Sequence, residues 1–180
     1  MRILVKSRET LRELSEADGV VAIVSVSDDP DDFPDVPENC DCRHALRLHF
    51  HDAETGLDVF SNSEVRPFAA SQAREVAAFV IGLPENTDTL VFQCELGLSR
   101  SAGMAAAVAR WMGKDDLQFF KDRLPNRLVY RMVLEQIDPE CERAGGGSVC
   151  SECGKTYADH PGHPAFPWLT ALCGGRNVKL

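Results

Sequence analysis

Residues 90–112 read LVFQCELGLSRSAGMAAAVARWM and decide how the rest of the sequence is interpreted. The apolar run Leu90–Phe92 predicts the end of a buried strand, and the Ala-rich run over 102–112 predicts a helix. Cys94 and Arg100 bracket the turn between them. Backbone N–H groups at the start of a helix attract anions, and arginine adds a fixed positive charge. The stretch therefore predicts an anion-binding loop that carries its own thiol.

This loop has the composition that thiol chemistry on a phosphate requires. A cysteine attacks as the thiolate, and a helix N-terminus together with a nearby arginine favours that form. The guanidinium of Arg100 can bind two phosphate oxygens at once. Gly97 permits a backbone conformation that other residues resist. Successive N–H groups can converge on one anion, so the candidate phosphate-binding residues are Glu95, Leu96, Gly97, Leu98, Ser99 and Arg100.

The pattern on either side of the loop predicts alternating strands and helices. We expect strands over 3–5, 20–26, 43–50 and 88–94, and helices over 7–17, 67–83, 100–113, 115–121 and 126–137. Such alternation is typical of an α/β fold with a mainly parallel central sheet flanked by helices. Ligands of these folds bind at the carboxyl ends of the strands, where Cys94 is expected.

Composition limits the domain organisation and the partners. The chain has 180 residues, of which 44% are hydrophobic, and this suffices for one domain over 1–143. A Gly-, Cys- and His-rich extension over 144–180 follows, which packs on that domain or stands apart. The net charge of -9 disfavours nucleic acid as a partner. No run approaches the ~20 apolar residues of a membrane span, and the N-terminus lacks a signal-peptide pattern. We therefore expect a cytoplasmic protein without a membrane partner.

The cysteines suggest a second site. There are seven, and Cys150 and Cys153 have the C-x2-C spacing of a structural zinc site. His160, His163 or Cys173 would complete it, although a redox pair and unliganded cysteines are alternatives. Cys40, Cys42 and His44 form a second group, interpreted as ordinary loop and strand residues.

Residues 93–107 resemble the signature loop of the cysteine-dependent protein tyrosine phosphatases, especially the dual-specificity branch. The resemblance extends in outline over residues 18–137 and includes Pro125-Asn126 before a helix. It implies a parallel-centred sheet flanked by helices, in agreement with the pattern above. One position departs from the family, which usually has histidine directly before the nucleophile, where this chain has Gln93.

The resemblance also implies a two-step reaction that needs no cofactor. Cys94 would form a phosphocysteine intermediate, Arg100 and the loop amides would hold the phosphate, and Ser101 would assist departure of the thiolate. An aspartate would act as acid and then as base. Its place in the family pattern favours Asp52; Asp58 and the acidic run over 28–35 are alternatives.

We therefore expect a phosphatase acting on phosphotyrosine, with phosphoserine and phosphothreonine as further candidates. Its partner would be a phosphorylated protein or a small phosphoester. The alternatives are a catalytically weak phosphate-recognition module, a hydrolase of a small non-protein phosphoester, and a sulfur-transfer protein that uses the same loop thiolate.

Overall fold

A computed structural model describes residues 1–53 and 65–138. Four parallel strands form one sheet in the order β1-β4-β2-β3. Their bounds are β1 Arg2–Ser7, β2 Val21–Ser27, β3 Cys42–His49 and β4 Thr89–Cys94. The expected parallel α/β fold is therefore confirmed. The two central strands, β4 and β2, are buried along their whole length, as continuous apolar runs predict.

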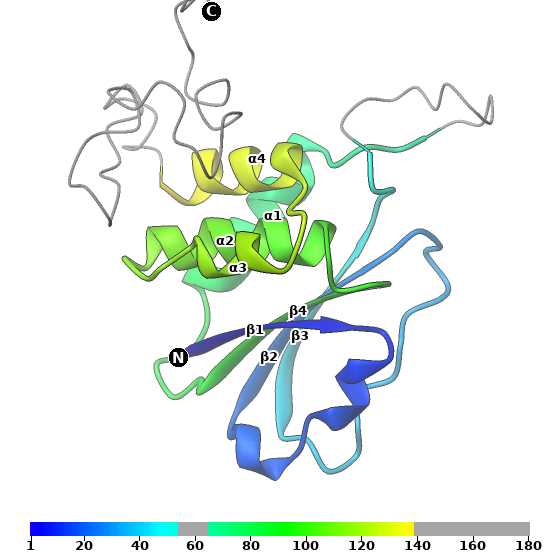
Figure 1. The fold of residues 1–180 in the computed structure, drawn as a ribbon. Coiled ribbons are helices and arrows are strands. Elements are labelled where there is room, and N and C mark those ends of the chain that lie inside the picture. The colour runs from blue at the N-terminus through cyan, green and yellow to red at the C-terminus, as the bar shows by residue number, and fades with distance from the viewer. Residues whose placement is uncertain (54–64, 139–180) are drawn as a thin grey trace, which may run out of the picture.

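One face of the sheet is covered by the helices α1 Ala70–Ile81, α2 Arg100–Trp111, α3 Gln118–Lys121 and α4 Arg127–Ile137 (Figure 1). Helix α2 lies against β4 and β1 and contacts α4 on its other side. Its alanines are fully buried, because small side chains let the helix approach both neighbours. Gly113, at φ +67°, follows the end of α2 in the left-handed conformation that often terminates a helix.

The opposite face of the sheet is covered by two short 3₁₀ helices, Thr10–Glu13 and Glu16–Asp18. The prediction of one helix over 7–17 is therefore wrong. Leu14 adopts an extended backbone and ends the first turn. The Asp18 carboxylate accepts from the Ser15 N–H and closes the second. Leu11 and Leu14 still point inward, because a spacing of three residues suits a 3₁₀ turn as well as an α-helix.

Other predicted elements are confirmed with changed bounds. Helix α1 begins at Ala70, so Pro67 precedes it rather than occupying its first turn. The predicted helix over 115–121 is shortened to Gln118–Lys121, since the Asp115 carboxylate accepts from the Leu117 N–H and forms a turn there. The extension over 144–180 lies outside the described residues. In the part of the chain that is described, no helix has the length and apolar character to cross a membrane.

Candidate active site

The loop between Cys94 and Arg100, called here the Cys–Arg loop (residues 94–100), connects the end of β4 to the start of α2. Cys94 is the last residue of the strand and Arg100 the first of the helix, as predicted. The Cys94 Sγ is buried and lies 3.0 Å from the Ser101 Oγ. A hydroxyl at this distance can hydrogen-bond to a thiolate, which is the role expected for Ser101.

Gly97 shapes the Cys–Arg loop at its tip. Its φ of +66° is in the left-handed region, and a Cβ built there would lie 2.8 Å from the Ser7 backbone nitrogen. The loop therefore packs directly on the end of β1, and the register that pairs Ser7 with Cys94 continues into this contact. Both the conformation and the close approach require glycine at this position.

The Arg100 side chain is buried beneath the Cys–Arg loop. Its Nη1 donates to the Asp28 Oδ1 at 2.5 Å and to the Phe50 carbonyl at 2.9 Å. Its Nε is buried and has no hydrogen-bond partner within residues 1–53 and 65–138. A guanidinium binds an oxyanion through a pair of parallel N–H groups, so an unpaired Nε is the donor that a phosphate would satisfy.

Asp52, the favoured acid, lies beside the Cys–Arg loop. Its Oδ1 accepts from the Ser99 Oγ at 2.8 Å and from the Asn126 Nδ2 at 2.9 Å. Asp52 is exposed, so its carboxylate can reach a bound substrate. The alternative acid Asp58 lies outside the described residues. Asp28, from the other alternative region, is brought to Arg100 instead.

Asn126 joins the start of α4 to this site. Its backbone N–H donates to the Ser99 carbonyl at 3.1 Å, and its Oδ1 caps α4 by accepting from the Val129 N–H at 3.0 Å. The close approach depends on Gly103 of α2, where a Cβ would lie 2.7 Å from the Asn126 carbonyl.

Gln93 directly precedes Cys94 and is fully buried. Its Oε1 accepts a hydrogen bond of 2.5 Å from the Ser25 Oγ of β2, whereas its Nε2 has no partner among the described residues. The side chain thus joins the two central strands behind Cys94 and adds no charge to the site.

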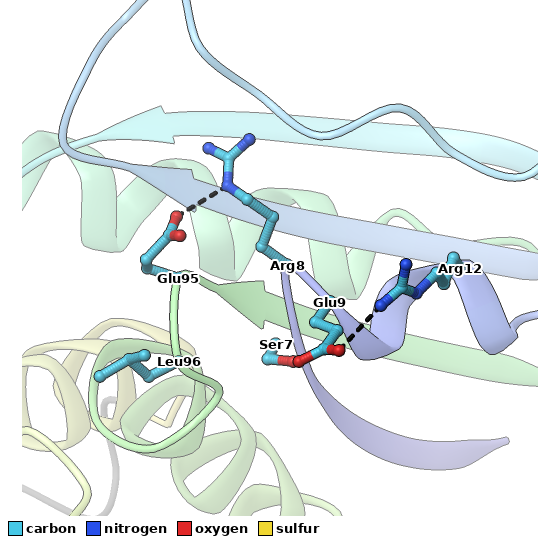
Figure 2. Close-up of a pocket in the computed structure, with 6 residues that line it drawn as sticks. All are labelled: Ser7, Arg8, Glu9, Arg12, Glu95 and Leu96. Carbon is cyan, nitrogen blue, oxygen red and sulfur yellow. Dashed lines mark hydrogen bonds and ion pairs between the residues drawn. The ribbon is translucent and has the colours of Figure 1, made fainter.

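Charged and apolar side chains surround the Cys–Arg loop at the protein surface. A pocket of about 520 Å³ lies on one side, lined by Ser7, Arg8, Glu9, Arg12, Glu95 and Leu96 (Figure 2). The Arg8 Nε donates to the Glu95 carboxylate at 2.7 Å, which raises the pKa of Arg8. On another side, the Leu124 N–H donates to the Leu98 carbonyl. Leu96, Leu98 and Leu124 are all exposed, so the loop and the residue paired with it present apolar side chains at the surface.

Cys40, Cys42 and His44 lie at the amino end of β3, whereas Cys94 is at the carboxyl end of the parallel strand β4. Burial raises the pKa of the Cys40 thiol to about 11 and also raises that of Cys42, which disfavours thiolate ligands. Within residues 1–53 and 65–138, no three His, Cys, Asp or Glu side chains are arranged to hold a metal ion. The zinc candidates Cys150, Cys153, His160, His163 and Cys173 lie outside the described residues.

Sequence reasoning missed two contributors. Asp28 enters the sequence analysis only as a member of the acidic run over 28–35, an alternative source of the acid, and not as a partner of Arg100; its place directly after a buried strand is a partial signal. Arg123, whose Nε donates to the Gly97 carbonyl at 3.2 Å, was not singled out, and nothing in its local sequence marks it.

Known proteins resemble this chain in fold but not in detectable sequence. No family model and no curated protein matches it. A crystal structure of PTPMT1 in complex with PI(5)P aligns over 79% of this chain and 94% of its own, with a TM-score of 0.50 and 12% identity. A crystal structure of human DUSP28 aligns over 78% of this chain and 94% of its own, with a TM-score of 0.47 and 18% identity. The alignment with PTPMT1 indicates that the chain has a protein tyrosine phosphatase-like fold.

Proposed function

We propose that this protein is a cysteine-dependent phosphatase that hydrolyses phosphotyrosine through a phosphocysteine intermediate. One observation carries the proposal: a buried thiol at the end of β4 faces the Ser101 hydroxyl, six residues before an arginine whose buried Nε has no partner. A loop of N–H donors at a helix start together with an unpaired guanidinium edge fits a phosphate group.

In the first step, the Cys94 thiolate attacks phosphorus and the bond between phosphorus and the ester oxygen breaks. Asp52 gives its proton to the leaving oxygen, so that a neutral phenol departs. The Cys–Arg loop amides and Arg100 hold the three phosphoryl oxygens on which negative charge gathers.

In the second step, a water molecule attacks the phosphocysteine and the S–P bond breaks. The Asp52 carboxylate accepts the proton of that water, and the Ser101 hydroxyl donates a hydrogen bond to the departing thiolate. Inorganic phosphate leaves, and both Cys94 and Asp52 return to their starting forms. Apart from this water and the substrate, every group in the scheme belongs to the chain, so the scheme uses no cofactor.

The apolar side chains around the Cys–Arg loop support an aryl substrate. Leu96 and Leu98 of the Cys–Arg loop and Leu124, whose N–H is paired with the loop, are exposed, whereas Cys94 is buried. A substrate must therefore reach inward past apolar side chains, and a phenol ring buries apolar area in doing so. Phosphoserine and phosphothreonine present shorter aliphatic groups to the same side chains, and we expect slower turnover of peptides that carry them.

The test is a panel of phosphotyrosine, phosphoserine and phosphothreonine peptides and a soluble phosphoinositide, assayed with wild type and Cys94→Ser in parallel. We expect Cys94→Ser to abolish hydrolysis and retain phosphopeptide binding. Cys40→Ser removes a thiol on the other face of the sheet and should remain active. Acid quenching of the wild type should trap phosphate on Cys94.

Three results would contradict the proposal. Hydrolysis that survives Cys94→Ser would remove the thiol from the chemistry. Wild type that binds phosphopeptide but never turns it over would instead be a recognition module. Turnover confined to the phosphoinositide would indicate a non-protein substrate.

A further inference from the structure

Asp28 places a half-exposed carboxylate on the buried guanidinium of Arg100. The side chain of Arg100 is 5% exposed and that of Asp28 is 56% exposed. The Nη1 of Arg100 donates to this carboxylate and also to the Phe50 carbonyl. Nη1 is therefore held by two acceptors, one directly after β2 (Asp28) and one directly after β3 (Phe50).

Holding Nη1 fixes the orientation of the whole group, because a guanidinium is planar and rigid. The edge formed by Nε and Nη2 is left for a ligand. Nε is buried without a partner, and no described residue accepts a hydrogen bond from Nη2. Asp28 and the Phe50 carbonyl thus leave free the pair of donors that can bind two phosphate oxygens in parallel.

The position of Asp28 is itself fixed by its own segment, residues 28–32, called here the acidic strap. The His49 Nε2 lies 2.8 Å from the Asp28 carbonyl. The Asp29 N–H donates to the Ser27 Oγ, and the Asp29 carboxylate accepts from the Asp31 N–H. The strap therefore begins as an ordered turn at the end of β2.

Arg8 ties the far end of the strap to the Cys–Arg loop. Its Nη1 and Nη2 donate to the Asp32 carboxylate, and its Nε donates to Glu95, directly after Cys94 (Figure 2 shows the contact with Glu95). The strap is thus joined to the loop near Cys94 through Arg8 and at Arg100 through Asp28.

We propose, on the basis of the function proposed above, that Asp28 is a positioning residue for the phosphate-binding edge of Arg100. Arg8 holds the strap that carries Asp28. Neither residue needs to touch the substrate; each acts through the orientation of Arg100.

A purely electrostatic role for Asp28 makes the opposite prediction. A carboxylate beside an anion site repels a phosphate dianion, so its removal should tighten anion binding. If Asp28 positions Arg100, its removal should weaken binding even though the site becomes more positive. The sign of the change therefore separates the two roles.

The experiment measures tungstate affinity by calorimetry, and kcat and KM for a phosphotyrosine peptide, in wild type, Asp28→Asn and Asp28→Ala. We expect kcat/KM and tungstate affinity to fall about tenfold in Asp28→Ala, the scale of one lost hydrogen bond to a charged group. Asp28→Asn retains an acceptor and should lie between this variant and wild type. Asp31→Asn makes the same charge change in the same strap, away from Arg100, and should match wild type.

Variants of Arg8 give a second, independent test of the proposal. Arg8→Ala should weaken tungstate binding when Asp28 is present and should add little in the Asp28→Ala background, because both variants release the same contact. Arg12→Ala is the matched control, since Arg12 lines the same pocket but pairs with Glu9 rather than with the strap. Fully additive losses would contradict the role given to Arg8.

The outcomes separate this inference from the proposed function. Wild type that binds tungstate but hydrolyses nothing would overturn the phosphatase proposal, while the affinities of the variants would still decide the role of Asp28. An active wild type whose Asp28 variants bind tungstate as tightly or more tightly would overturn the positioning role alone. Wild type that neither binds nor hydrolyses would overturn both.

Discussion

Asn126 Nδ2 donates a hydrogen bond of 2.9 Å to Asp52 Oδ1 and so connects the start of α4 to the segment that follows β3. These two residues are far apart in the chain, and their contact sets where the proposed acid stands. Ser99 reaches the same oxygen from the Cys–Arg loop. The Asp52 carboxylate is therefore oriented by the Cys–Arg loop and by the N-cap residue of α4 together.

Asp52→Asn should lower turnover of a phosphotyrosine peptide at least about tenfold, because the amide cannot protonate the leaving oxygen or activate water. Steady-state kinetics on the peptide check this. An activated aryl phosphate is a poor substitute, since its leaving group needs little help from an acid. Unchanged turnover on the peptide would remove Asp52 from the role.

Asn126→Asp should separate positioning from stability. The new carboxylate still accepts from the Val129 N–H and caps α4, so we expect the melting temperature to change little. It cannot donate to Asp52 and places a like charge beside it, so kcat for the peptide should fall about tenfold. A variant with normal kcat would show that the contact with Asn126 is dispensable.

Gly97→Ala and Gly113→Ala form a matched pair, since both glycines have a positive φ near +66°. At Gly113 a Cβ meets nothing within 4 Å, so only the backbone strain of about 1 kcal/mol is expected. At Gly97 the Cβ would also meet the backbone of Lys6 and Ser7, and the loop must move away from β1. Gly97→Ala should lose most activity and phosphate affinity, whereas Gly113→Ala should keep both. Similar activity in the two variants would contradict this account of the loop.

Ser25→Ala should destabilise the protein by about 1–3 kcal/mol, because it leaves the buried Oε1 of Gln93 without a donor. Adding Gln93→Met should recover part of that loss, since neither side chain then buries an unpaired polar group there. Urea unfolding of the two single variants and the double variant checks the coupling. Simple additivity would show that this hydrogen bond contributes little.

Asp116 should make stability depend on pH. Burial raises its pKa, although its hydrogen bond from Tyr130 and the nearby Arg110 act in the other direction. The folded state therefore favours the protonated carboxyl. Its stabilising contribution is fully present below the ordinary aspartate pKa of about 3.9 and is lost as pH rises through the raised value.

The free energy of unfolding of wild type, minus that of Asp116→Asn, should accordingly decrease as pH rises from about 3 to 7. Urea titrations across this range measure the difference. Asp122→Asn, at an exposed position in the same region, is the control. A difference that grows with pH would reverse the assignment for Asp116.

Local sequence was sufficient to predict the Cys–Arg loop, because Cys94, Gly97 and Arg100 act within one strand–turn–helix unit. Asp52 was favoured from its place in the family pattern, and the structure puts it beside the loop because it follows β3, whose carboxyl end meets the same edge of the sheet. Asp28 follows β2 directly, but the sequence does not show which acidic residue of the run over 28–35 contacts Arg100. Which of them reaches Arg100 depends on β2 lying between β3 and β4, and no residue of the strap records that order.

The prediction of a helix over 7–17 was wrong because its outcome also depends on contacts that the local sequence does not show. A Leu11–Leu14 spacing is compatible with both α and 3₁₀ turns. The Asp18–Ser15 hydrogen bond exists only once the 3₁₀ turn has formed, and the Asp18–Arg2 ion pair is a tertiary contact with β1. Arg8 lies in this segment. Because the backbone conformation there could not be predicted from sequence, the ion pairs of Arg8 with Glu95 and Asp32 could not be predicted either.

The contact of Gly97 with the backbone of Lys6 and Ser7 also bears on when the site can form. Strand β4 and helix α2 are adjacent in the chain, and close neighbours assemble quickly because only a small loop must be closed. The tip of the Cys–Arg loop instead packs on β1, an edge strand that lies far from the loop along the chain. We therefore expect the Cys–Arg loop to reach its final conformation late in folding, after much of the core is buried.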